Sequence, residues 1–340
     1  MRYYMRHITL FIALLTICIK GNSQTNVQLI LKDGKQISKV YAQDFSFKES
    51  LTNPYLDTIN FNFEKSNNID LFNIGCYIND KQPWKQIWLD SGKITILAHM
   101  DSTSFKIDTV INSPMYDYVK KFNIEFGNII KQKDTSQANL YLVKNLNSNI
   151  DNPFSLWISM LYLNLNQNLK DNISELKQIL LRQGTKFSWF RLYDDVNGRI
   201  DNILSTKSLI ISDFKFIDKQ KKVTSLSLNK ANFYVLDFWF LGCLPCKKEH
   251  KIIQKKYNEL LKIKVETIGI STDSYSKKWK DYLATNHYKW PNYLQASDKK
   301  ITETLSINAF PFYIVINTEG EIVGRYNSFS DILKRFKIDE

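Results

Sequence analysis

The sequence predicts a mixed α/β domain at the C-terminus, preceded by a small β-rich domain and a helical segment. Its 340 residues are enough for two or three domains. The spacing of apolar residues changes from strand-like to helix-like near residue 114, and from about residue 209 strand-like and helix-like runs alternate. Hydrophobic residues make up 44% and charged residues 24% of the chain, which excludes a disordered chain and a membrane protein with many spans.

Residues 1–23 are typical of a secretory signal peptide. Two arginines precede a mostly apolar run over residues 8–19, and small residues stand at the positions expected before a cut at Gln24. The run is shorter than the roughly 20 residues that span a bilayer. We therefore expect the mature chain in the periplasm or cell envelope. Lipid anchoring at Cys18 is a minor alternative, because the residue before it is not the small one that a lipobox requires.

Residues 24–110 are expected to form the β-rich domain. Residues 27–31 and 36–40 have strand-like composition and flank Asp33-Gly34, a dipeptide suited to a hairpin turn. Cys76 has mainly apolar neighbours, which predicts a buried and inert thiol.

Residues 111–206 are expected to be helical. Their apolar residues recur at helical spacing in two stripes, one of Trp157, Met160, Leu161 and Leu165 and the other of Leu176, Ile179 and Leu180. Neither this segment nor the one before it contains a phosphate-binding glycine loop, a pair of catalytic carboxylates or a histidine cluster with metal-ligand spacing. Both stripes therefore indicate core packing.

Residues 207–340 are expected to form the α/β domain. A hairpin over residues 211–228 and a strand over residues 233–239 precede a helix from about Leu244 to Lys262. The later elements are a strand, a helix, a short helix, a strand, a turn at residues 317–320, another strand and a closing helix. This order predicts a mixed sheet covered on both faces.

The formal net charge of +12 lies mainly on residues 207–340. Lysines scattered over solvated helix faces explain this excess better than a nucleic-acid site does, and we expect no nucleic-acid partner.

The motif that carries chemistry is Cys243-Leu-Pro-Cys246, directly after the strand that ends at Trp239. Cys243 is expected at a helix N-terminus, exposed, where unpaired amide groups and the helix dipole lower the pKa of its thiol below about 8.5. Cys246 lies one turn further along, where it can resolve a mixed disulfide formed on Cys243. Pro245 suits the first helical turn.

The segment 237–246, Asp-Phe-Trp-Phe-Leu-Gly-Cys-Leu-Pro-Cys, together with Phe310-Pro311, resembles the thioredoxin superfamily over about residues 209–340. Cys246-Lys-Lys-Glu249 and residues 268–271 are similar to the TlpA/ResA-like extracytoplasmic reductases. The N-terminal β-rich and helical parts resemble the arrangement common in Bacteroidetes members.

This resemblance implies a redox-active Cys243–Cys246 disulfide as the only active group, with no metal or other cofactor. It also implies that Asp237, a buried acid beneath the disulfide, or Glu249 takes or relays the proton of Cys246. Pro311 matches the cis-proline that faces the two cysteines, and Phe310 offers its backbone to a substrate chain. The remaining substrate contacts are expected from Trp239, Leu244 and Pro245.

Two departures from the family pattern affect substrate choice. Gly242 stands where a tryptophan commonly precedes the first cysteine, which predicts a wider rim or a looser loop. Phe310 and Phe312 flank Pro311 where smaller residues are usual, which predicts a narrower or more apolar groove.

Alternative functions are less consistent with the same residues. A peroxiredoxin-like peroxidase needs a threonine where Phe240 stands, and covalent haem needs a histidine where Lys247 stands. Zinc held by Cys243, Cys246 and His250 lacks a fourth ligand. His250 is expected on the helix surface near the site, with a role in proton transfer as the alternative. A non-catalytic envelope binding protein with a vestigial dithiol domain stays open.

The direction of electron flow is expected to be reductive, because Leu244 supplies no charge between the cysteines to stabilise the thiolate. The lysines after Cys246 have the opposite effect, because their positive charges stabilise the thiolate. The expected partners are disulfide-bearing envelope proteins, including apocytochrome c, and a membrane electron donor of the DsbD/CcdA type.

Overall fold

The computed structural model describes residues 23–32, 37–45, 49–79, 81–101, 104–274, 277–296 and 300–339. Its packing divides the chain into two units, Met1–Asn123 and Ile124–Glu340, with the boundary inside a helix. Of the predicted signal peptide, only Ser23 is among the described residues. The predicted turn at Asp33-Gly34 also lies outside them.

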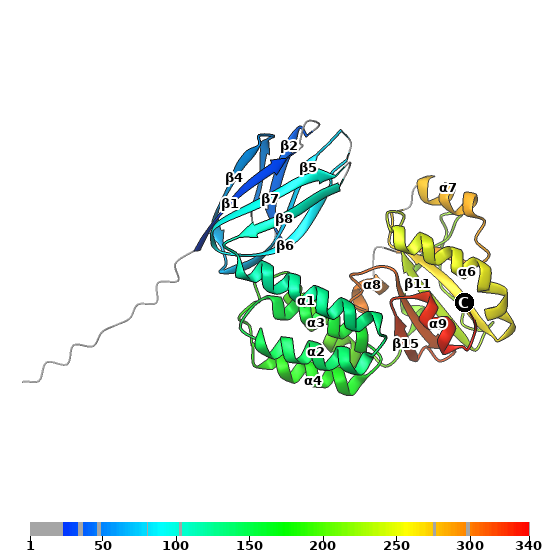
Figure 1. Ribbon diagram of the computed structural model, residues 1–340. Coiled ribbons are helices and arrows are strands. Elements are labelled where there is room, and N and C mark those ends of the chain that lie inside the picture. The colour runs from blue at the N-terminus through cyan, green and yellow to red at the C-terminus, as the bar shows by residue number, and fades with distance from the viewer. Residues whose placement is uncertain are drawn as a thin grey trace, which may run out of the picture. The chain divides into compact units, whose positions relative to one another are not determined.

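The first unit contains two four-stranded sheets, with the strand orders β4-β1-β7-β8 and β3-β2-β5-β6 (Figure 1). The strands β1 and β7 are parallel, and the other neighbouring pairs are antiparallel. The bounds are β1 (Ser23–Lys32), β2 (Lys39–Asp44), β3 (Ser50–Pro54), β4 (Thr58–Ser66), β5 (Ile69–Tyr77), β6 (Trp84–Asp90), β7 (Gly92–Asp101) and β8 (Ser104–Ile111). The predicted β-rich character of this region is confirmed.

Alternate residues of the strands point into one core, as the two-residue period requires. Phe63 and Phe72 meet in it with ring centroids 5.0 Å apart. Cys76 is fully buried there, so the predicted burial of its thiol is confirmed, and burial raises the pKa of this thiol to about 11. The predicted hairpin is wrong: β1 pairs with β4 and β7, whereas β2 pairs with β3 and β5, so the two strands belong to different sheets.

Five helices follow, and the predicted helical character is confirmed. They are α1 (Pro114–Lys131), α2 (Thr135–Ser148), α3 (Phe154–Asn166), α4 (Lys170–Leu181) and α5 (Leu192–Ser205). The stripe on α4 is buried as predicted. The prediction that the stripe on α3 packs in the core is wrong, because Trp157, Met160, Leu161 and Leu165 are only half-buried. The buried residues of α3 include Phe154, Ile158, Tyr162 and Leu163.

The C-terminal part of the second unit follows the predicted element order closely. Its elements are a 3₁₀ turn (Ile211–Asp213), β9 (Phe216–Ile217), β10 (Val223–Thr224), β11 (Phe233–Trp239), α6 (Leu244–Lys262), β12 (Val265–Ser271), α7 (Lys277–Asn286), β13 (Asn292–Gln295), α8 (Ile301–Thr304), β14 (Phe312–Asn317), β15 (Ile322–Tyr326) and α9 (Phe329–Arg335). The predicted hairpin is β9–β10, and the strand β13 was not predicted. The predicted boundary near residue 206 stays a prediction, because packing keeps Ile124–Glu340 together.

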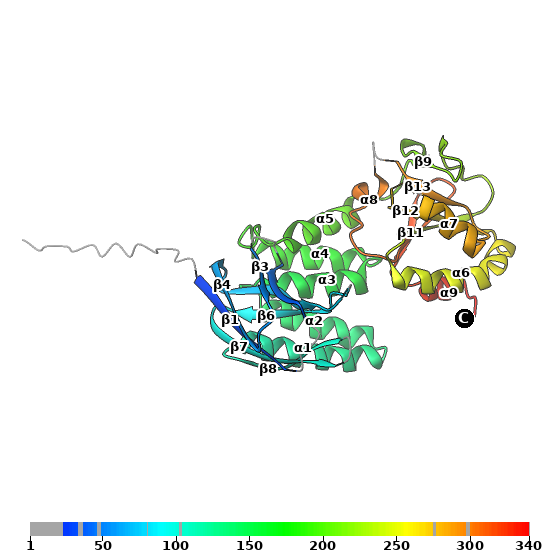
Figure 2. The ribbon, with the colours of Figure 1, turned by 90° about the horizontal axis from the view of Figure 1, so that it is seen from above.

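These strands form one seven-stranded mixed sheet in the order β10-β9-β13-β12-β11-β14-β15. The central strands β11, β12 and β13 are parallel, and β14 and β15 are antiparallel to their neighbours. One face packs against α6 and α9, and the other against α8 and the segment before β9 (Figure 2). Because side chains alternate along β11, Asp237 and Trp239 share the face of Val235, which is covered by α6.

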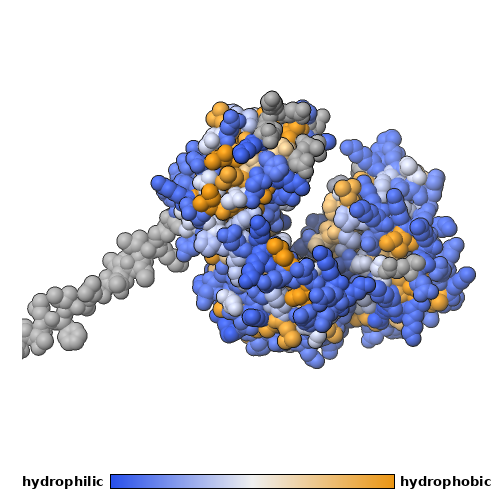
Figure 3. Space-filling view, viewed as in Figure 1, coloured by the Kyte–Doolittle hydropathy of each residue, from blue (hydrophilic) through white to orange (hydrophobic). Residues whose placement is uncertain are grey.

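The surface seen in Figure 3 is mostly hydrophilic, with small apolar patches scattered over it. Such isolated apolar side chains are normal on folded proteins. Among the described residues, no helix combines the length and the apolar character that crossing a bilayer requires.

Candidate active site: a disulfide at the start of a helix

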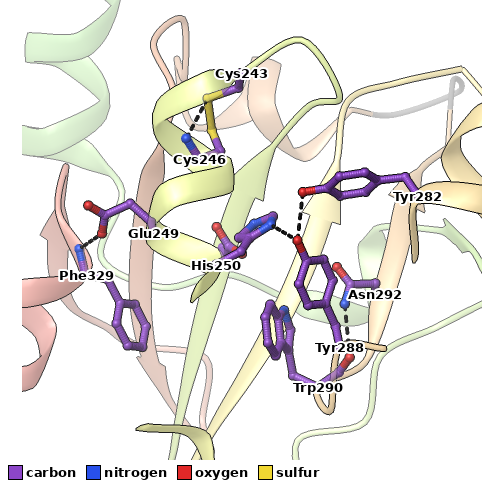
Figure 4. A network of polar contacts seen from close by, with 10 residues as sticks. Cys243, Cys246, Glu249, His250, Tyr282, Tyr288, Trp290, Asn292 and Phe329 are labelled. Carbon is purple, nitrogen blue, oxygen red and sulfur yellow. Dashed lines mark hydrogen bonds and ion pairs between the residues drawn. A yellow bond between two sulfur atoms is a disulfide. The ribbon is translucent and has the colours of Figure 1, made fainter. Parts of the chain in front are cut away.

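The two cysteines of the motif are joined at the N-terminus of α6, as Figure 4 shows. Cys243 is the N-cap residue, and Pro245 lies in the first turn, as predicted. The backbone N–H of Cys246 donates to Sγ of Cys243 over 3.1 Å. The same donor would stabilise a thiolate on Cys243 when the disulfide is reduced.

The loop between β11 and α6 is held by Asp273, a residue that the sequence analysis missed. Its Oδ2 accepts from the backbone N–H of Leu241 over 2.8 Å and from the hydroxyl of Ser271 over 2.7 Å. Asp273 follows β12 directly, and the parallel pairing of β11 with β12 brings their C-terminal ends to the same edge of the sheet. The signal in the sequence is therefore a carboxylate just after the second buried strand.

The rim of the site is apolar. The side chain of Leu244 is 69% exposed and Pro245 is exposed, whereas Cys243 itself is only 4% exposed. The expected exposure of Cys243 is therefore not found in the disulfide form, in which only its immediate neighbours are open to solvent.

Phe310 and Pro311 are joined by a cis peptide bond, as the family resemblance implies. Both residues are half-buried, and the ring of Phe310 meets that of Phe240 edge-on, with centroids 5.4 Å apart. Both phenylalanines pack against the buried cluster that contains the two cysteines. A side chain at Gly242 would meet the Phe240 ring 2.8 Å from its Cβ, so Phe240 occupies the space that the glycine leaves.

Trp239 was predicted to contact substrate, but its side chain is fully buried. It belongs to the cluster beneath the disulfide, because it points to the face of the sheet that α6 covers. It is a core residue of the site and offers no surface to a partner.

The buried acid Asp237 lies in the core with His250. Both side chains are fully buried, and Oδ2 of Asp237 is 3.1 Å from Nε2 of His250. The prediction that His250 is a surface residue is wrong, since positions 246 and 250 of α6 share the face that packs on the sheet. The acid and the base are therefore brought into contact inside the domain, away from solvent.

The second candidate acid, Glu249, points away from this pair, towards α9 (Figure 4). Its Oε2 accepts from the backbone N–H of Phe329 over 2.7 Å. Burial raises the pKa of the Glu249 carboxyl, and this hydrogen bond lowers it in part. Its working role and that of Asp237 stay predictions.

Lys247, Lys248 and Lys251 follow the cysteines on α6, and Lys248 and Lys251 are exposed. They give the start of the helix a positive surface. Among the described residues, no group of three or more histidine, cysteine or acidic side chains is placed to hold a metal ion.

Comparison with known proteins places the site in a thioredoxin-like domain. Residues 232–322 match a family model described as thioredoxin-like. Two curated relatives are thiol-disulfide oxidoreductases ResA. The one from Bacillus subtilis is 24% identical over 111 residues, which cover 33% of this chain and 62% of the relative. The one from Bacillus cereus is 28% identical over 113 residues, which cover 33% of this chain and 64% of the relative. The match thus spans less than two thirds of either relative.

Solved structures from Bacteroides are also similar to this chain. A thiol:disulfide interchange protein from Bacteroides sp. is 29% identical, with 36% of this chain and 83% of that chain covered and a TM-score of 0.34. The thioredoxin domain of a thiol-disulfide oxidoreductase from Bacteroides vulgatus is 28% identical, with 39% and 97% covered and a TM-score of 0.35.

Proposed function

We propose, from the premise that the C-terminal domain is thioredoxin-like, that this protein is a thiol-disulfide oxidoreductase that reduces disulfides of cell-envelope proteins. In this reaction the Cys243 thiolate attacks a client disulfide and forms a mixed disulfide. Cys246 then attacks Sγ of Cys243, which restores the internal disulfide and releases the client with two thiols.

The observation that carries this proposal is the Cys243–Cys246 disulfide at the N-cap of α6. A helix N-terminus favours the thiolate, and a partner one turn away makes the second step intramolecular. The exposed Leu244 and the half-buried Phe310 support an apolar contact with a client chain.

The direction of the reaction is proposed to be reductive. Leu244 and Pro245 place no charge between the cysteines, unlike strong oxidants, which stabilise the thiolate there. We expect a midpoint potential more negative than about −200 mV. A titration against glutathione measures it, and a clearly higher value would assign the protein to oxidation or isomerisation.

The location and the partners are proposed from the sequence. The basic and apolar start of the chain supports export to the periplasm or envelope. A reductase there has to be reduced again, which requires a membrane electron donor of the DsbD/CcdA type. Apocytochrome c with oxidised haem-binding cysteines is one candidate client. The lysines after Cys246 favour acidic clients, for which added salt should slow the reaction.

Insulin reduction with dithiothreitol as the electron source tests the proposed activity. We expect the wild-type chain to accelerate the reaction and Cys243→Ser to abolish the acceleration. The matched control Cys76→Ala should behave as wild type, because Cys76 is buried in the core of the first unit. Equal rates for wild type and Cys243→Ser would favour the alternative, a binding protein with a vestigial dithiol. Cys246→Ser should trap clients on Cys243, and mass spectrometry would then identify them.

A further inference from the structure

The contact between the buried side chains of Asp237 and His250 has no role in the thiol-disulfide steps described above. Two ionisable side chains with no exposed surface face each other at 3.1 Å beneath a disulfide. The contact is short, but its angle is not that of a hydrogen bond, and neither Asp237 oxygen has a hydrogen-bond partner among the described residues. A buried carboxylate without a hydrogen-bond partner is costly, so this acid is placed where a nearby proton donor can supply the missing contact.

The other ring nitrogen of His250 connects this pair with the outside. Its Nδ1 is 3.3 Å from the hydroxyl of Tyr288, and that hydroxyl is 2.7 Å from the hydroxyl of Tyr282 (Figure 4). His250 is fully buried, whereas both tyrosines are partly exposed. The three side chains therefore form a continuous row of polar groups from the core to the surface.

The Tyr288 hydroxyl has one hydrogen and two neighbours. It donates either to an unprotonated Nδ1 of His250 or to Tyr282, and in the second case it accepts from an N–H at Nδ1. Burial raises the pKa of Tyr288, so its hydroxyl stays protonated and available as a donor. Switching between the two arrangements moves one proton along the row.

The titratable groups around the pair come from α6, β14 and α7. Glu249 lies beside His250 on α6, Tyr313 faces Asp237 from β14, and Lys247 lies 5.2 Å from the centroid of the Tyr282 ring on α7. Burial raises the pKa values of Glu249 and Tyr313, and Glu249 is already bonded to Phe329. Among the described residues, the polar contacts of the pair therefore lead from Asp237 to solvent only through His250, Tyr288 and Tyr282.

We propose that His250 is a positioning residue that keeps Asp237 ready to accept the proton of Cys246, and that Tyr288 and Tyr282 pass this proton between the pair and solvent. This inference rests on the proposed function. Cys246 and His250 lie one turn apart on the same buried face of α6, so His250 and its partner Asp237 lie on the side of the helix to which the resolving cysteine also belongs.

The resolving step conserves atoms and electrons. Cys246 attacks Sγ of Cys243 in the mixed disulfide, the bond from Cys243 to the client sulfur breaks, and that sulfur leaves with the electron pair as a thiolate. The proton of the Cys246 thiol passes to the Asp237–His250 pair, which changes from a net negative to a neutral pair. It then leaves through Tyr288 and Tyr282, and solvent protonates the client thiolate. Reduction of the internal disulfide returns the proton by the same row.

The two thiol steps can be separated with an aromatic disulfide, 5,5′-dithiobis(2-nitrobenzoate), in a Cys18→Ser background. The reduced protein releases one thionitrobenzoate when Cys243 attacks and a second when Cys246 resolves the mixed disulfide. At pH 7 we expect His250→Phe to slow the second release about 100-fold, within the range of a lost general base, and Tyr288→Phe to slow it about 10-fold. The first release should change less than twofold.

The dependence on pH distinguishes proton transfer from a structural effect. As the pH rises, hydroxide increasingly removes the proton of the Cys246 thiol directly, so the difference between variant and wild type should shrink to within a few-fold at high pH. Tyr257→Phe is the matched control, because Tyr257 also packs against the Trp290 ring but lies outside the row. It should match wild type at every pH.

A second release that is unchanged in both variants, or slowed equally at every pH, would overturn the proposal. If His250→Phe fails to fold, Tyr288→Phe decides alone, because it removes one hydroxyl and keeps the ring. A wild-type protein that releases no second thionitrobenzoate contradicts the proposed function instead, so the two failures are distinguishable.

Discussion

Asp273→Ala is the most informative change outside the cysteines, because one carboxylate holds the loop that presents Cys243. The variant loses hydrogen bonds of 2.8 Å from Leu241 and 2.7 Å from Ser271, whose side chain is fully buried. Charge-assisted bonds contribute about 1.5–3 kcal/mol each. Two such bonds would sum to about 3–6 kcal/mol. Because Asp273 is half-buried and partly screened by solvent, we expect a smaller total loss of about 2–3 kcal/mol.

Urea unfolding of the oxidised protein measures this loss. A change of about 2–3 kcal/mol corresponds to roughly a 30- to 140-fold change in the folding equilibrium constant. Asp281→Ala is the matched control, since Asp281 forms an exposed ion pair with Lys277 on α7 and should cost less than about 1 kcal/mol. Insulin reduction should fall only in the Asp273 variant. Equal stability of the two variants would refute the idea that Asp273 holds the loop.

Three further predictions concern stability. The folded-state pKa of Cys76, about 11, lies above its ordinary value of 9.0, so the folded form binds this proton more tightly. The advantage of wild type over Cys76→Ala in urea unfolding should therefore be complete below pH 9 and decrease by about 2 kcal/mol as the pH rises to 11; a constant difference contradicts this. Gly269→Ala should lower the melting temperature strongly, because the added Cβ would overlap Oδ1 of the buried Asn292. An unchanged melting temperature would show that the surrounding side chains rearrange without cost. The raised pKa of Glu249 means that the folded state favours its protonated form, so Glu249→Gln should gain stability relative to wild type as the pH rises from 4 to 7, and the opposite trend in urea unfolding would refute it.

The elements near the cysteines could be predicted well because their signals are local. The apolar run of β11 and the helical spacing after Leu244 gave the observed bounds of both elements. The four-residue strand β13 was missed, because so short an apolar alternation does not stand out from a loop. The β1–β2 hairpin was wrong because turn chemistry cannot show that the two strands belong to different sheets.

The two cysteines and the cis-proline of the site could be predicted, because they belong to recognisable motifs. The places of Trp239 and His250 depend on which face of β11 meets α6, and this is decided by packing over the whole domain. The contact of Tyr288 with His250 and that of Asp273 with Leu241 bring together residues more than 30 positions apart in the sequence, so the partners cannot be read from a local pattern.

The reactivity of Cys243 tests the central claim most directly. The reduced protein is alkylated with iodoacetamide across a pH series, and mass spectrometry locates the modified residue. A thiolate stabilised by the N-terminus of α6 predicts modification at Cys243, with a rate that rises with an apparent pKa below about 8.5. Faster modification of Cys246, or a Cys243 rate that rises only at or above that pKa, would contradict the account.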